Sequence, residues 1–290
     1  MRRLKIFHRT YYNFSGLVRL GPHRLLLRPR EGHDLQIESS SLKISPPAAV
    51  RWARDEYDNS VAVATFDTPA NQLMIASEVI IRHHVDAPLD FLIDDHAVHY
   101  PFATEPRSAA VLRPFLHSQV SWAEQQTLRS WTRNFWRDGE PIQTYDLLRR
   151  LCSGINCTLA YRIREEPGVQ AIEETLTQGS GSCRDFAYLL MEAARLLGLA
   201  ARFVSGYLDT PSLGGSFGAT HAWTEIYLPG AGWRGFDPTI GEMTGSKHIA
   251  VAIGQLPDAV PPIAGSFFGS VGADLYVGVW VTELANLALR

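Results

Sequence analysis

The sequence has little cysteine, and this limits the kind of protein it can encode. Its three cysteines, in a chain of 290 residues, are Cys152, Cys157 and Cys183. An odd, sparse count without framework spacing argues against a disulfide-stapled scaffold and for a reducing compartment. No second cluster of ligands accompanies Cys152 and Cys157, so we do not expect them to bind a metal.

Long apolar runs and an excess of charge are lacking as well. No stretch approaches about 18 uninterrupted apolar residues, the length of a membrane-spanning helix. The amino terminus, MRRLKIFHRTYYNFS, contains no apolar run of about 7–15 residues of the kind found in signal peptides. We therefore expect a cytoplasmic protein without membrane association. Its formal net charge of −3 creates no overall field that would attract nucleic acid.

Residues 1–104 are rich in short strand candidates. The first, residues 4–14, is followed by Gly16 and by Gly21-Pro22, which we expect to interrupt it. Further candidates, separated by Pro, Gly, Asn and Asp, are residues 24–30, 35–44, 60–66 and 73–85. Regular spacing of short strands is typical of an antiparallel β-sandwich, which we predict for this region.

Histidines and aspartates between residues 83 and 99 invite comparison with a metal site. They are His83, His84, Asp94, Asp95, His96 and His99. A catalytic zinc helix carries H-E-x-x-H, whereas this stretch offers only H-x-x-H, and Pro88 and Pro101 make it an irregular connection. We therefore expect no metal here, and no cofactor elsewhere in the chain.

Residues 105–265 combine helical and strand patterns. Residues 105–114 resemble a linker, and residues 116–135 and 144–157 are predicted helices. A closing strand, LYVGVWVT, is predicted within the last segment, residues 266–290. The sequence leaves open whether this strand joins the N-terminal sheet or the region before it.

Cys183 lies where a turn is expected to become a helix. The four residues before it, GSGS, form a turn that ends in a potential N-cap serine, Ser182. Apolar residues then recur at helical spacing: Phe186, Leu189, Leu190, Ala193, Ala194 and Leu197. At such a helix start the helix dipole favours a thiolate, but it contributes only about 1 kcal/mol. A nearby imidazole must supply most of the activation.

An imidazole and a carboxylate follow Cys183 in the order that this chemistry needs. His221 opens the strand candidate HAWTEIYL, in which alternate side chains share one face. The turn PGAG follows, and residues 233–237 return as a neighbouring strand, so a hairpin can place Asp237 beside His221. Cys183 would then be the nucleophile, His221 its base, and Asp237 the acid that orients the ring.

Three motifs, GSCRDFA at Cys183, HAW at His221 and GWRGFDPT at Asp237, resemble those of the transglutaminase-like superfamily, circularly permuted relatives of papain. The whole chain is similar to a bacterial two-part version, often described as a cysteine protease candidate. The resemblance implies an α+β fold in which a β-sandwich (residues 1–104) precedes a papain-like transglutaminase core (105–265), a helix packed on an antiparallel sheet. A closing strand lies in residues 266–290. It also implies a triad of Cys183, His221 and Asp237.

Acyl transfer also needs hydrogen-bond donors for a developing oxyanion. The backbone N–H of Cys183 is the first expected donor. Gln178, shortly before Cys183, and Trp223, shortly after His221, are candidates for the second, and the sequence does not choose between them.

The sequence thus predicts thiol-dependent acyl transfer from an amide or peptide bond of a protein or peptide substrate. Water as acceptor gives a cysteine peptidase or amidase, and a primary amine gives a protein-glutamine transglutaminase. We favour hydrolysis, because bacterial members of this type are mostly regarded as proteases and nothing here resembles the calcium sites of animal cross-linking enzymes. A non-catalytic binding or assembly module with the same fold is the remaining alternative. The presence of all three triad residues disfavours it. The sequence does not predict an oligomeric state.

Overall fold

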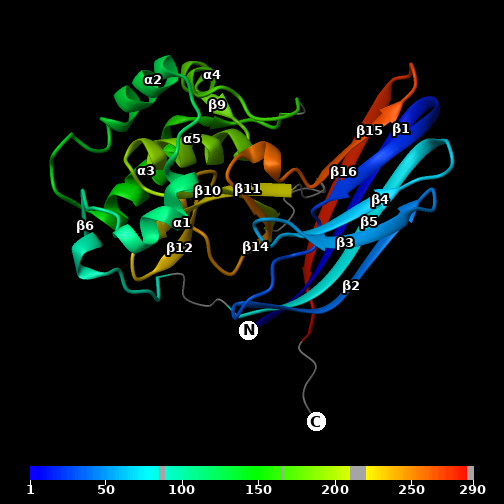
Figure 1. The fold of residues 1–290 in the computed structure, drawn as a ribbon, viewed down its shortest axis with the longest axis horizontal. Coiled ribbons are helices and arrows are strands. Elements are labelled where there is room, and N and C mark those ends of the chain that lie inside the picture. Colours follow the sequence, from blue (N-terminus) through cyan, green and yellow to red (C-terminus); the bar gives the residue numbers. More distant parts are fainter. Residues whose placement is uncertain (85–88, 165, 210–219, 286–290) are drawn as a thin grey trace, which may run out of the picture.

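The computed structural model describes residues 1–84, 89–164, 166–209 and 220–285. Figure 1 shows two parts side by side, a core in which helices cover a sheet and an elongated part made of long strands. No helix in the described ranges is long and apolar enough to span a bilayer.

The elongated part is one antiparallel sheet that curls on itself. Its strands are β1 (Arg2–Leu25), β2 (Leu35–Ser45), β3 (Ala49–Arg54), β4 (Ser60–Thr65), β5 (Ala70–His83), β15 (Ile263–Phe268) and β16 (Ala273–Glu283), with β1 central in the order β2-β5-β1-β4-β3. The first half of β1 pairs with β5 and β16, and the second half pairs with β4 and β15. A cluster that includes Phe14, Leu25, Ala62 and Ile75 fills the space between the halves.

Strand β1 runs through the points where the sequence predicted interruptions. Its pairing with β5 shifts register between Asn13 and Val18, around Gly16, and its pairing with β15 shifts between Leu20 and His23, around Gly21-Pro22. These residues mark irregularities at which the strand changes partners rather than ends. The β-rich prediction for this region is confirmed, but the separate short strands expected at its start were wrong.

The C-terminal strands belong to the N-terminal sheet. Both β15 and β16 pair with β1, and the β16 register extends from Leu4–Glu283 to Phe14–Ala273. The chain therefore leaves the elongated part after β5, builds the core, and returns to complete the first sheet (Figure 1). This answers the question that the sequence left open.

The core is a five-stranded antiparallel sheet covered by helices. The strand order is β13 (Glu242–Met243), β12 (Gly232–Asp237), β11 (Thr220–Leu228), β10 (Ala201–Leu208) and β14 (His248–Gly254). The helices are α1 (Pro106–Leu116), α2 (Trp122–Thr132), α3 (Thr144–Thr158), α4 (Ile172–Gln178) and α5 (Cys183–Leu196). Short elements complete it: η1 (Asp95–Ala97), β6 (His99–Tyr100), β7 (Ile142–Gln143), β8 (Ala160–Tyr161), β9 (Ser180–Gly181) and η2 (Pro257–Ala259).

Helix α5 packs on the sheet as the apolar spacing predicted. Phe186, Leu190 and Ala194 are buried along it, and the Thr224 hydroxyl of β11 donates a hydrogen bond to the Ala187 carbonyl at 2.6 Å. The predicted α+β core, a helix on an antiparallel sheet, is confirmed. The linker expected at residues 105–114 is instead α1, which starts at Pro106 because the first turn of a helix needs no donor from proline nitrogen.

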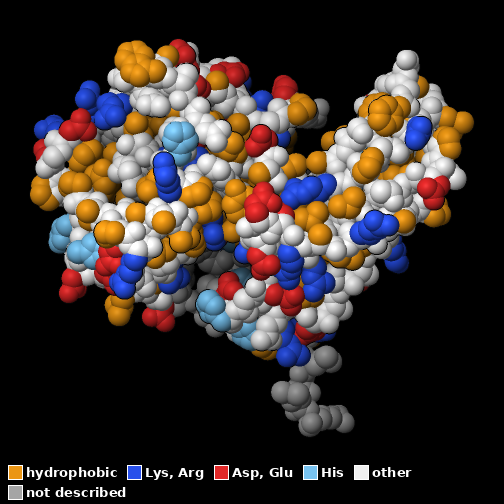
Figure 2. Space-filling model, viewed as in Figure 1, with side chains coloured by type: hydrophobic (Ala, Val, Ile, Leu, Met, Phe, Trp, Pro, Cys, Tyr) orange, Lys and Arg blue, Asp and Glu red, His pale blue; other side chains and the backbone are white. Residues whose placement is uncertain are grey.

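The two parts touch at the inner end of the N-terminal sheet. Figure 2 shows its outer end standing away from the core, with hydrophobic side chains scattered over it. At the inner end the fully buried Asn59 amide bonds both backbone groups of Ile253 in β14, accepting from N–H at 2.9 Å and donating to C=O at 2.8 Å. The N–H of Arg30 donates to the Ala250 carbonyl on the same strand at 2.9 Å. The N-terminal sheet thus anchors β14.

We expect Asn59→Ala to lower the free energy of unfolding by about 2–4 kcal/mol, because it leaves buried backbone groups of Ile253 without partners. Urea denaturation measures the change. Gln72→Ala is the matched control, since that amide is exposed and donates only to the Asn13 side chain, and it should cost less than about 0.5 kcal/mol. Equal effects of the two substitutions would contradict the anchoring role.

Candidate active site

Cys183 is the first residue of α5 and follows a tight turn. Gly179 closes α4 with a φ of 63°, a left-handed conformation that glycine adopts without strain, and Ser182 caps α5 in an extended conformation. The N–H groups of the first helical turn have no partner within the helix, so they and the helix dipole favour an anion at this end. Cys183 is only 7% exposed, so its sulfur lies in a largely desolvated place.

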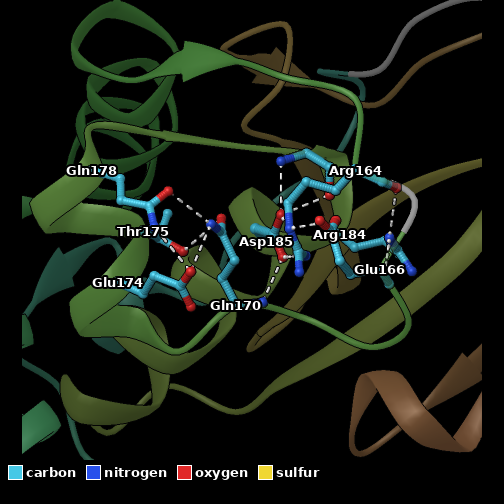
Figure 3. A network of polar contacts seen from close by, with 9 residues as sticks. Arg164, Glu166, Gln170, Glu174, Thr175, Gln178, Arg184 and Asp185 are labelled. Carbon is cyan, nitrogen blue, oxygen red and sulfur yellow. Dashed lines mark hydrogen bonds and ion pairs between the residues drawn. The ribbon is translucent and has the colours of Figure 1, made fainter.

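A buried carboxylate, Asp185, fixes the start of this helix (Figure 3). Its oxygens accept the N–H and hydroxyl of Ser182 at 2.8 and 2.7 Å. They also accept the N–H of Gln170 at 2.7 Å and the guanidinium of Arg164 at 2.9 Å. The segment that precedes α4 is therefore tied to the first turn of α5. Arg184 adds bonds to the carbonyls of Arg164 and Glu166 (Figure 3).

The predicted hairpin is present and brings His221 and Asp237 together. His221 lies near the start of β11 and Asp237 ends β12, with Nε2 of the ring 2.6 Å from Oδ2 of the carboxylate. Oδ1 accepts the N–H of Thr239 at 2.9 Å. Since Nε2 is engaged by Asp237, Nδ1 is the ring nitrogen left for Cys183.

The electrostatics of the site favour a charged imidazole. Burial alone would lower the pKa of His221, but hydrogen bonds to Asp237 and to the Cys183 thiol outweigh it and raise the pKa to about 10. Burial would raise the pKa of Asp237, yet hydrogen bonds from His221 and His248 hold it well below its usual range. A carboxylate anion beside an imidazolium is thus the stable state around neutral pH.

The sequence analysis missed His248. This residue opens β14, is 7% exposed, and places Nε2 3.0 Å from the same Oδ2 of Asp237 that His221 contacts. Asp237 therefore joins two imidazoles. A signal was present, because His248 directly precedes the apolar run IAVAIG, but nothing in the spacing indicated that this strand returns beside β10.

Tyr161 was missed as well. Strand β8 pairs in parallel with β9, with Tyr161 opposite Gly181, so the ring stands beside the turn that leads to Cys183. Partial burial and the neighbouring Cys183 raise the pKa of Tyr161 to about 12, which keeps its hydroxyl protonated around neutral pH. The protonated hydroxyl can donate a hydrogen bond next to the turn that leads to Cys183.

Gln178 and Trp223, the candidate oxyanion donors, lie in different surroundings. The exposed Gln178 amide donates to Glu174 at 3.0 Å and accepts from Gln170 at 3.3 Å (Figure 3), and no hydrogen bond joins it to Cys183 in the described part of the chain. The Trp223 ring is 2% exposed and packs edge-on against His248, with ring centroids 5.3 Å apart.

A polar pocket lies behind this histidine, between the N-terminal sheet and the core. Its volume is about 580 Å³, and its walls include Trp223, His248, Arg234, Arg30 and Asp34. Trp223, a candidate oxyanion donor in the sequence analysis, therefore lines this pocket together with His248. Tyr161, on the strand beside the turn that leads to Cys183, is a further donor candidate.

Two groups in the described ranges bring three potential metal ligands within 4.8 Å of one another. One is His221, Asp237 and His248, in which hydrogen bonds of 2.6 and 3.0 Å account for the contacts between rings and carboxylate. The other, Asp94, His96 and Glu105, includes two of the residues between positions 83 and 99 that invited a metal comparison. Asp94 and His96 are exposed, and acidic groups of this kind are common without a metal.

The chain matches two families along its length. Residues 4–82 match the Bacterial transglutaminase-like N-terminal region, and residues 130–238 match the Transglutaminase-like superfamily. An uncharacterized protein of Mycobacterium tuberculosis is 28% identical over 279 residues, which are 92% of this chain and 88% of that protein. An uncharacterized protein of Mycobacterium leprae is 35% identical over 117 residues, 39% of this chain and 41% of that protein.

The fold also has a solved counterpart. The crystal structure of a "Putative Cysteine Protease" from Cytophaga hutchinsonii superimposes with a TM-score of 0.76 at 18% identity, covering 98% of this chain and 91% of that one. The similarity extends over both the curled N-terminal sheet and the helix-covered core. Residues 130–238 are therefore a transglutaminase-like superfamily region, and residues 4–82 are a bacterial transglutaminase-like N-terminal region.

Proposed function

We propose that the protein is a thiol-dependent acyl-transfer enzyme that hydrolyses amide or peptide bonds through Cys183, His221 and Asp237. The observation that carries the proposal is the bond of 2.6 Å between one nitrogen of the His221 ring and the buried Asp237 carboxylate. Cys183, the first residue of α5, also contributes to the raised pKa of His221. Nucleophile, base and orienting acid are the parts that covalent acyl transfer needs.

In the acylation step the Cys183 thiolate attacks the carbonyl carbon and the C=O electron pair moves onto oxygen. The backbone N–H of Cys183 and the Tyr161 hydroxyl are the donors available to that oxyanion. When the C–N bond breaks, the His221 imidazolium gives its Nδ1 proton to the leaving amine. A thioester on Cys183 and a neutral His221 remain.

In the deacylation step the neutral His221 takes a proton from water as the water oxygen attacks the thioester. The C–S bond breaks, the thiolate is restored beside the imidazolium, and a carboxylic acid leaves. A primary amine in place of water would give transamidation by the same steps. Hydrolysis is proposed because water needs no acceptor site of its own.

The other two cysteines differ from Cys183 in ways that support this assignment. Burial raises the pKa of Cys152, so this thiol stays protonated and inert. Cys157 is free and exposed. Three free thiols suit a reducing compartment, so we propose a cytoplasmic enzyme. Its proposed substrate is a protein or peptide.

Iodoacetamide at neutral pH should alkylate Cys183 selectively and faster than Cys157, because only a thiolate reacts. The exposed Cys157 serves as an internal control for an ordinary thiol, and mass spectrometry of tryptic peptides reads both sites. His221→Ala should remove the advantage of Cys183. Alkylation of Cys183 at the rate of Cys157, in the native protein, would point to a non-catalytic module.

A peptide library with and without a labelled primary amine should give cleavage or ammonia release without incorporation of the amine. Cys183→Ala should remain folded by circular dichroism and lose turnover. His221→Ala should reduce turnover by about 10²–10⁴-fold, the usual contribution of general acid–base catalysis. Incorporation of the amine would replace hydrolysis with cross-linking, and turnover by Cys183→Ala would refute the nucleophile.

Turnover of an amide should persist above neutral pH and fall near pH 10. The pKa of His221 is raised from 6.5 to about 10, so the proton needed by the leaving amine is present below that pH and lost above it. Alkylation of Cys183, which needs no proton donor, should not fall there. Asp237→Asn should move the decline of turnover towards neutral pH. A decline near pH 7 in the unaltered protein would contradict this charge assignment.

A further inference from the structure

His248 shares the carboxylate on which the proposed mechanism depends. Its Nε2 lies 3.0 Å from Oδ2 of Asp237, and Nε2 of His221 lies 2.6 Å from the same oxygen. The Asp237 side chain is fully buried, so its charge is offset by these protein donors rather than by bulk water. Among the described residues, the Asp237 side chain has three hydrogen-bond donors: His248, His221 and the N–H of Thr239.

The hydrogen bonds of His248 define its tautomer. The N–H of Gly245 donates to Nδ1 at 3.2 Å, so Nδ1 carries no proton and acts as an acceptor. The ring proton must then be on Nε2, where it points at Asp237. His248 is therefore a neutral donor in this arrangement, since a proton on Nδ1 would oppose the Gly245 N–H.

Packing holds the ring in this orientation. Trp223 meets it edge-on at 5.3 Å between centroids, and the side chain of His248 is 5% exposed. The strand that His248 opens is the one that the N-terminal sheet anchors through Asn59 and Ile253. The donor is thus part of a rigid element rather than a mobile surface group.

We propose that His248 is a positioning residue: its Nε2–H fixes the Asp237 carboxylate and takes up part of its charge, so that the His221 imidazolium can still release its proton to the leaving amine. This inference rests on the proposed function. Without the hydrogen bond from His248, the Asp237 carboxylate would interact more strongly with the His221 imidazolium. The imidazolium would then hold its proton more tightly and be a weaker acid. The hydrogen bond from His248 to Asp237 weakens that interaction.

Other titratable groups face the same pair and belong in any account of its pH dependence. Cys183 from α5 contributes to the raised pKa of His221, and Asp237 from β12 carries the negative charge. The Asp237 charge contributes to the raised pKa values of Tyr161 in β8 and Cys152 in α3. The substitutions described next leave all four in place.

The test is a pair of substitutions that separate the two hydrogen bonds of His248. His248→Gln keeps an N–H near the position of Nε2 and retains the donor to Asp237. His248→Asn keeps a polar acceptor near the position of Nδ1, for Gly245, and loses the donor. A merely structural role would make the two variants similar.

His248→Asn should lower kcat for an amide substrate by about 10- to 100-fold with KM unchanged, as loss of an outer hydrogen-bond partner does around metal-bound histidines. The high-pH decline in turnover should move upward by about half a unit to one unit. Alkylation of Cys183 should be unaffected, because it needs no proton donor. His248→Gln should stay within a few-fold of the native protein with an unshifted profile.

Equal losses in both variants, or an unmoved or lowered pH profile in His248→Asn, would overturn the proposal. Nitrogen-15 spectra of the histidine rings in the native protein test it without any substitution and without turnover. They should show His248 protonated at Nε2 and not at Nδ1 at neutral pH, and the opposite tautomer would refute the inference. If the native protein turns over no amide, the proposed function fails, while these spectra still decide the state of His248.

Discussion

The Asp237 carboxylate is the group on which the rest of the site depends, because a buried anion is tolerated only when donors surround it. In the part of the chain that the structure describes, its donors come from three segments: His221 on β11, Thr239 just after β12, and His248 at the start of β14. All three segments must be in register for the anion to be satisfied. The site therefore assembles only when these strands of the core sheet are correctly paired.

The N-terminal sheet also contributes to the position of these donors, because its residues bond to β14. Strand β14 lies at the edge of the core sheet beside β10, and its outer backbone groups at Ile253 and Ala250 bond to Asn59 and Arg30. The N-terminal sheet thus holds the strand that carries His248, and His248 holds Asp237. Because β15 and β16 complete this sheet, the end of the chain contributes to a structure that supports a site near its middle.

Local patterns predicted much of the candidate site, and longer-range pairing decided the rest. The Gly/Ser turn before Cys183 and the PGAG turn before β12 are short-range signals, so the helix start and the His221–Asp237 hairpin followed from the sequence. His248 is brought to Asp237 by the pairing of β14 with β10, and Tyr161 to Cys183 by the pairing of β8 with β9. No turn motif or hydrophobic periodicity in the sequence predicts either pairing. The same limit explains β1, whose glycines mark changes of partner that only the whole sheet defines.

Asp185 and Asp237, two buried aspartates, hold different parts of the site. Asp185 binds the turn and the segment before α4 to the first turn of α5, and so sets where the Cys183 sulfur stands. Asp237 sets where the His221 ring stands and keeps it charged. Separate anions thus place the sulfur and the imidazole: Asp185 in α5 and Asp237 in β12. A shift of either would change the distance between them, because each anion anchors only one of the two. The reactivity proposed for Cys183 depends on this pair of anchors.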